Sequence, residues 1–206
     1  MNPFAAALCS ACVSSLRSLK MTFGGIASAN ASMEVGMFSV AISSGHLRRL
    51  EKLRVRGLRG IEEVGALCMG LGSGELSSLR VLTLGFDVRL ERESGRAFSE
   101  AVVAEKLPRL VTLDADLALN GEGVRALAEG WMTRQPPPLQ QLKLSRSSIN
   151  SGAADALLTL LGSTRVPSLE TVDLDFCSWE AERFRSMLSR AFPEIISCKT
   201  QAAEFQ

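Results

Sequence analysis

A six-residue pattern, Leu-x-x-Leu-x-Leu, recurs along the chain and constrains its fold more than any other feature. The copies read LRSLKM from Leu16, LEKLRV from Leu50, LRVLTL from Leu79, LVTLDA from Leu110, LQQLKL from Leu139 and LETVDL from Leu169. Their first residues lie 34, 29, 31, 29 and 30 residues apart, and a degenerate seventh copy, IISCKT, begins at Ile195, a further 26 residues on. A period near 30 indicates repeated supersecondary units that bury a core only when they stack.

Each hexamer predicts one short strand. Side chains alternate between the two faces of a strand, so the fourth and sixth positions face one way and the fifth and seventh face the other. In the fourth copy, Leu113 and Ala115 are expected to face the core together with Leu110 at the bend, whereas Asp114 and Asp116 point out of the sheet. No helical spacing of apolar residues explains this segment.

The segments between the hexamers predict amphipathic helices. Val124, Leu127, Ala128 and Trp131 illustrate the apolar spacing of i, i+3, i+4 and i+7. Helices are expected within 61–72, 94–105, 120–131, 150–162 and 178–190, and in the longer, leucine-poor first spacer, 24–49. The expected N-caps are Ser94, Asn120, Asn150 or Ser151, and Ser178, and the expected helix stops are Gly72 and Gly162.

The alternation of strand and helix predicts the fold class. At this period it favours right-handed βα units that stack into a parallel sheet covered by helices. Because helices are wider than strands, such a stack is expected to curve into a horseshoe with the sheet on its concave face. The prediction is therefore an α/β solenoid of about six to seven repeats, forming a single domain over 1–206. Within it we expect an N-terminal helix or cap at 1–15, repeats at 16–200 and a tail at 201–206.

The six hexamers, with SINSGAADALLTLL (148–161) and LNGEGVRALAEGW (119–131), resemble the leucine-rich repeat family and, within it, the ribonuclease-inhibitor-like class. The resemblance covers about 16–200 and implies the βα horseshoe, but no particular activity. The class usually places Asn or Cys three residues after the hexamer. This chain has Gly24, Leu58, Asp87, Ala118, Ser147 and Cys177 there, so only Cys177 fits the class and the loops are expected to be irregular.

Composition limits the classes of function. The chain has 23 Lys and Arg against 22 Asp and Glu, so it lacks the basic excess typical of a nucleic-acid-binding protein. No apolar run approaches the roughly 18 residues that a membrane span needs, and the N-terminus lacks the basic start of a signal peptide. Five cysteines, an odd number at irregular spacing, indicate reduced thiols in a cytoplasmic protein.

The sequence favours no catalytic, metal or cofactor site. Cys9 and Cys12 form a CxxC, but a zinc site would need a second ligand pair at matching spacing, and His46 is the one histidine of the chain. A nucleophilic site would have to use His46, which lies in a Ser/Gly-rich stretch with no recognisable partner motif. Paired aspartates on the fourth and sixth strands suggest a cation site, but a neighbouring lysine and the open location argue against it. We therefore expect a non-enzymatic protein without a cofactor.

The candidate working surface is the concave face of the predicted sheet. Its first two strands are basic, later strands carry acids with bases between them, and phenylalanines are expected at one edge, exposed or half exposed. The predicted partner-binding residues are Lys20, Lys52, Arg54, Arg56, Asp114, Asp116, Lys143, Arg146, Asp173, Asp175, Phe23, Phe86 and Phe176. Two interpretations stay open. The face docks a protein of complementary charge, or its charges form a solvated cross-strand ladder and its phenylalanines pack under the following loops.

The favoured hypothesis is a non-enzymatic interaction module that binds a protein partner, and neither nucleic acid nor a membrane, through the concave face. One alternative is a regulator of a small GTPase, as a sub-family with similar repeats is, although no segment matches the catalytic elements of that group. Another is a fragment of a larger scaffold or receptor, because the chain shows no clear polar cap before its first strand and solenoids need capped ends. Uncapped ends would lead to self-association.

Overall fold

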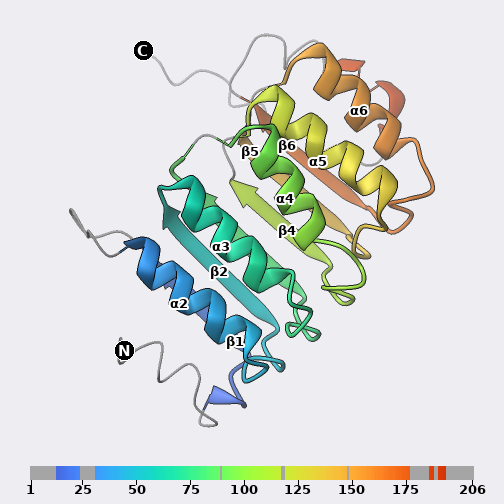
Figure 1. Ribbon diagram of the computed structural model, residues 1–206. Coiled ribbons are helices and arrows are strands. Elements are labelled where there is room, and N and C mark those ends of the chain that lie inside the picture. The colour runs from blue at the N-terminus through green and yellow to red at the C-terminus, as the bar shows by residue number, and fades with distance from the viewer. Residues whose placement is uncertain are drawn as a thin grey trace, which may run out of the picture.

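The predicted strands and helices alternate along the chain. The structure, a computed structural model, describes residues 13–23, 31–88, 90–116, 119–147, 149–176, 186–187 and 190–193. Its elements are β1 (Ser18–Thr22), α2 (Ala31–Ser43), β2 (Lys52–Leu58), α3 (Ile61–Leu71), β3 (Val81–Phe86), α4 (Arg92–Ala101), β4 (Thr112–Asp116), α5 (Gly121–Thr133), β5 (Gln141–Ser147), α6 (Ser151–Leu161) and β6 (Thr171–Phe176). The strands form one parallel sheet in the order β1-β2-β3-β4-β5-β6. Helices α2 to α6 lie side by side on one face of this sheet (Figure 1).

The recurring hexamers coincide with the strands and occupy equivalent positions in the sheet. The fifth hexamer residues are successive partners across all six strands: Lys20, Arg54, Thr83, Asp114, Lys143 and Asp173. At the start of β2, the carbonyl oxygen of Arg17 accepts hydrogen bonds from the N–H groups of Glu51 at 2.8 Å and Lys52 at 2.9 Å. The carbonyls of Glu51, Arg80, Val111 and Gln140 accept the same pair of bonds from the next unit. The backbone hydrogen bonds between neighbouring strands therefore repeat with the same period as the hexamers in the sequence.

The apolar strand positions form the core between the sheet and the helices. Leu110, Leu113 and Ala115 are fully buried and Asp114 and Asp116 are partly exposed, as predicted. An apolar residue three positions before the hexamer, outside the predicted pattern, is buried as well. It recurs as Leu47, Leu76, Leu107 and Val166, and its carbonyl accepts a hydrogen bond from the first residue of the hexamer. In these four units the buried pattern thus extends over nine residues.

Most helix boundaries follow the sequence signals. The side-chain oxygens of Asn120 and Asn150 each accept a hydrogen bond at 2.8 Å from the N–H three residues on, so both are N-caps. Gly72 and Gly162 are the C-caps of α3 and α6, as predicted. Helix α2 confirms the helix expected in the first spacer. The helix predicted at 178–190 with its Ser178 cap, the copy at Ile195, the tail and residues 1–12 of the N-terminal helix or cap lie wholly or mainly outside the described residues.

Both ends of helix α4 differ from the predicted ones. The helix begins at Arg92 after the N-cap Glu91, so Ser94 lies inside the first turn and is not the cap. It also ends at Ala101, four residues before the predicted end at 105. The reason is burial: Val102 and Val103 are both in the core, and the chain turns there so that the Val103 carbonyl accepts hydrogen bonds from the next turn.

Replacing Asn120 by alanine is expected to lower the free energy of unfolding by about 1 kcal/mol, because the N–H of Gly123 loses its acceptor at the start of α5. Asn120→Asp keeps an acceptor there, so most of the stability should remain. Urea unfolding followed by circular dichroism measures both. Equal losses in the two variants would contradict the capping role.

Candidate interaction surface

The outward-pointing residues of the six strands form a polar surface, here called the strand face. It consists of the third, fifth and seventh residues counted from the start of each hexamer. In β2 these are Lys52, Arg54 and Arg56, which alternate with the buried Leu53 and Val55. No helix of the described residues covers this face, since α2 to α6 lie on the other side of the sheet (Figure 1). The structure therefore brings most of the predicted charged residues onto one surface.

Four cations gather where β1 and β2 pair, and we call them the basic cluster: Lys20, Lys52, Arg54 and Arg56. Lys20 is the register partner of Arg54. Among the described residues none of the four forms an ion pair. The Nε of Arg54 is buried and donates no hydrogen bond. The Cγ of Arg56 lies 3.2 Å from the place where a Cβ of Gly85 would stand, so its stem crosses the glycine of the neighbouring strand.

The acids of the strand face begin two strands away from β2. Asp114 of β4 lies in register with Lys143 of β5, which lies in register with Asp173 of β6. Lys143 Nζ approaches Asp173 Oδ2 to 3.6 Å, whereas Asp114 forms no ion pair with a described residue. One rung of the charge-ladder interpretation is thus present. A solvent-exposed pair of this kind contributes only about 0–1 kcal/mol to stability.

The prediction that Phe23 lies exposed or half exposed at an aromatic edge is wrong. Phe23 is only 5% exposed, and its ring centroid lies 5.7 Å from that of Phe38 in α2. The N–H of Phe23 donates a hydrogen bond to the Arg56 carbonyl oxygen at 2.8 Å, so the backbone pairing of β1 with β2 continues past the end of β1. Gly57 follows with φ +80°, and a Cβ there would lie 1.8 Å from the Phe23 carbonyl oxygen. Phe23 is therefore a core residue that packs against α2, and not an exposed anchor.

The three phenylalanines of the predicted edge are the eighth residues counted from the start of their hexamers. The eighth residues of the six strands do not form one regular row. Bulges in β2 and β5 shift the register, so Phe86 pairs with Leu58 rather than Gly57, and Phe176 pairs with Ser147 rather than Arg146. The side chains of Phe86, Arg146, Asp175 and Phe176 lie outside the described residues. Their predicted roles therefore stay predictions.

The charged side chains of α4 and α5, in contrast, pair with one another. Arg96 lies 3.0 Å from Glu100, and Arg125 lies 2.7 Å from Glu129. Arg92 reaches Glu122 at 3.5 Å and Glu129 at 3.8 Å. The hydrogen bond to Glu129, together with the charges of Glu129 and Glu122, raises the pKa of Arg125. Each cation of these two helices thus pairs with an acid of α4 or α5.

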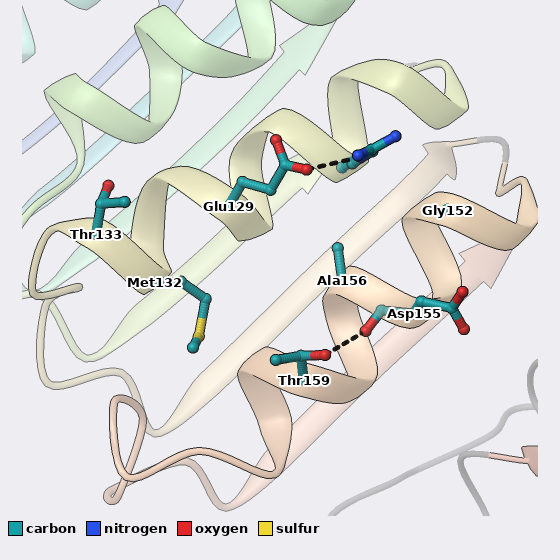
Figure 2. Close-up of a pocket in the computed structure, with 8 residues that line it drawn as sticks. Glu129, Met132, Thr133, Gly152, Asp155, Ala156 and Thr159 are labelled. Atoms are coloured by element: carbon teal, nitrogen blue, oxygen red, sulfur yellow. Dashed lines mark hydrogen bonds and ion pairs between the residues drawn. The ribbon is translucent and has the colours of Figure 1, made fainter.

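An open groove of about 620 Å³ lies between α5 and α6. Figure 2 shows Met132 and Ala156 pointing into the space between the two helices. Glu129 is held by its ion pair within α5, and the Thr159 hydroxyl donates to the Asp155 carbonyl at 2.8 Å. The lining residues include neither histidine nor cysteine, so they match no Ser/His/Asp or Cys/His arrangement.

Apolar side chains on α2 and α3 form a second exposed surface, which the sequence analysis did not identify. Met33 and Val40 of α2 and Ile61 and Met69 of α3 are each more than half exposed. On α3, Met69 lies opposite the buried stripe of the same helix and Ile61 lies at its flank. The spacing of eight residues between Ile61 and Met69 is the sequence signal that indicates a shared outer face.

Cys68 of α3 is a buried free thiol, and desolvation raises its pKa from 9.0 to about 12. Below pH 9 the thiol is protonated in the folded and unfolded chains alike. Between about pH 9 and 12 only the unfolded chain releases the proton, so the folded state loses up to about 4 kcal/mol. Unfolding free energies of wild type and Cys68→Ala from pH 7 to 10.5 should therefore diverge above pH 9, with wild type falling faster. Parallel curves would contradict this prediction.

Clusters of potential metal ligands and membrane-spanning helices are both absent from the part of the chain that the structure describes. Its described residues contain no group of three or more His, Cys, Asp or Glu side chains that could hold a metal ion. None of the described helices is long and apolar enough to cross a membrane. The imidazole of His46 forms no hydrogen bond or ion pair with another described residue.

Comparison with known proteins adds no functional assignment. No protein-family model matches the chain, and a search of curated proteins returns no significant match.

Proposed function

We propose that the chain is a leucine-rich repeat protein of the ribonuclease-inhibitor-like class, and that it binds a protein partner through the strand face without catalysing a reaction. Three features support the class: the hexamer period, the sequential parallel sheet, and the carbonyl ladder between successive units. In a horseshoe of this class the strand face is the concave surface. The odd number and irregular spacing of the cysteines support a cytoplasmic location.

The unpaired charges of the strand face carry the functional proposal. The described cations of α4 and α5 find acids within the molecule, whereas the basic cluster and Asp114 find none among the described residues. Charges that face solvent without an internal partner are free to interact with another molecule. Basic and acidic side chains at opposite ends of one surface also give a partner a defined orientation.

The sheet supplies rigidity for such a contact. The interacting side chains stand on hydrogen-bonded strands whose inner face is packed against helices, so little backbone order is lost on binding. Charges of both signs steer encounter and suppress wrong partners more than they add affinity. Binding should therefore weaken as salt is raised.

Partner capture from cell lysate tests the proposal. The face variant combines Arg54→Glu, Arg56→Glu, Asp114→Lys and Asp173→Lys, which reverses both signs and keeps the net charge. Its matched control exchanges the charges of two helical ion pairs through Arg96→Glu, Glu100→Arg, Arg125→Glu and Glu129→Arg. Circular dichroism confirms that both variants fold.

We expect a protein that wild type and the helical control capture and the face variant loses. The same captured set in all three would remove the strand face as the binding surface. A protein lost only by the helical control would instead assign binding to the helices. The exposed apolar residues of α2 and α3 would then be the next surface to vary.

A further inference from the structure

We propose that the basic cluster binds an extended acidic segment of the protein partner, with carboxylates at alternate residues. This inference rests on the proposed function and specifies the chemistry of the partner. Three observations carry it: the spacing of the cations, their lack of internal partners, and the position of the nearest acids on the same face.

The spacing of the cluster matches an extended peptide. Lys52, Arg54 and Arg56 are alternate residues of β2 on one face. Alternate residues of a strand lie about 6.6 Å apart, so these cations form a column about 13 Å long. Lys20 stands beside Arg54 on the neighbouring strand, about 4.8 Å away at the backbone. Carboxylates at alternate residues of an extended segment repeat at the same interval, so such a segment brings one acid to each cation of the column.

The cluster has reason to attract anions. Like charges side by side on neighbouring strands repel each other, and no described acid relieves this repulsion. The Nε of Arg54 is buried, so a carboxylate that approaches from solvent meets the terminal nitrogens of this guanidinium. A carboxylate can accept two parallel N–H bonds from a guanidinium, which is the strong geometry for arginine. The stem of Arg56 passes over Gly85 of β3, where no side chain obstructs it.

The same face disfavours a long polyanion or an anionic membrane. The row that contains Lys20 and Arg54 continues through Thr83 to Asp114, two strands or about 10 Å from Arg54. Asp116 lies in the neighbouring row of β4. A nucleic-acid backbone or a bilayer surface extending past the cluster would meet these acids. A short protein segment along β2 avoids them, so the observations favour the peptide.

Fluorescence anisotropy with defined probes tests the inference. The main probe is a fluorescein-labelled decapeptide of five Thr-Glu repeats, and a scrambled peptide with its five glutamates in one block controls for the spacing. A ten-nucleotide oligothymidine and phosphatidylserine vesicles test the other anions. The protein variants are Arg54→Gln with Arg56→Gln, Lys20→Gln with Lys52→Gln, and the helical control Arg96→Gln with Arg125→Gln, all of equal charge.

We expect the alternating peptide to bind wild type and the helical control equally. It should bind each cluster variant about tenfold more weakly, since two charged contacts are lost in each. The block peptide should bind wild type more weakly than the alternating one. No binding of the alternating peptide, equal binding by all variants, or tighter binding of oligothymidine or vesicles would each overturn the inference.

The two proposals fail separately. Loss of the captured partner by the face variant, together with no binding of the alternating peptide, would uphold the strand face and reject the acidic segment. An unchanged captured set would reject the strand face itself. If the peptide binds through the basic cluster but no partner is captured through the strand face, the cluster is an anion site that the proposed function does not use.

Discussion

Replacing Trp131 by alanine is expected to lower the free energy of unfolding by about 3–5 kcal/mol. Trp131 is fully buried in α5 and is the largest such side chain in the described structure. Its indole Nε1 donates to the Val102 carbonyl at 2.9 Å, where the chain leaves α4. The alanine variant loses both the packing of the ring and the donor for a buried carbonyl. Urea unfolding followed by far-ultraviolet circular dichroism measures the change.

Trp131→Phe separates the two contributions. Phenylalanine keeps much of the apolar volume but no indole N–H, so the expected loss is smaller, about 1–3 kcal/mol. Hydrogen exchange at the end of α4 should increase in both variants, because both leave the Val102 carbonyl without its partner. A loss below about 1 kcal/mol in Trp131→Ala would contradict the position of this ring at the centre of the core.

Replacing Gly95 by alanine is expected to destabilise the protein by about 3 kcal/mol, although alanine is the better helix former. A Cβ at Gly95 of α4 would lie 2.3 Å from the carbonyl oxygen of Gly123 in α5. The obstructing atom belongs to the backbone, so a rotamer change cannot relieve the contact. The two helices would have to move apart, which opens the core around them.

Gly65→Ala is the matched control in α3. Nothing lies within 4 Å of a Cβ at Gly65, so this substitution should stabilise the protein by about 0.5–1 kcal/mol through helix propensity alone. The opposite signs of the two glycine variants are the specific expectation. If both variants are stabilised, α4 and α5 do not approach as closely as the structure has them.

The repeated strands could be predicted from the sequence because their pattern depends only on local alternation and on a regular period. Leu113 and Ala115 are buried and Asp114 is partly exposed because side chains alternate along a strand. The cross-strand rows followed from aligning the hexamers, since each unit pairs with the next at equivalent positions. The same alignment placed the basic cluster on one face before its geometry was known.

The differences at Phe23 and at α4 have identifiable physical causes. Phe23 occupies the eighth position, which has the same parity as the inward-facing fourth and sixth positions, so its burial against Phe38 of α2 continues the alternation of β1 rather than forming an exposed edge. Ser94 is a favourable N-cap residue, but burial of Val102 and Val103 fixes the end of α4 and the helix begins earlier. The boundaries of α4 depend on tertiary packing.

The state of each charge could not be predicted either. The alternation of side chains placed Arg54 and Lys143 on one face, but the ion pair of Lys143 with Asp173 and the unpaired Nε of Arg54 depend on side-chain conformation. The helical period of apolar residues predicts which face of α3 is buried, but it says nothing about an apolar residue outside that face, such as the exposed Met69. Opposite stripes on one helix show which apolar residues the core leaves out.

Site-specific photocrosslinking tests the location of the partner most directly. Benzoylphenylalanine replaces Thr83, which lies in register between Arg54 and Asp114 at the middle of the strand face, or Arg96, which is exposed on α4. Both proteins are irradiated with the partner that wild type captures. The account predicts a crosslinked product from position 83 and none from position 96. A product from position 96 alone would contradict binding through the strand face.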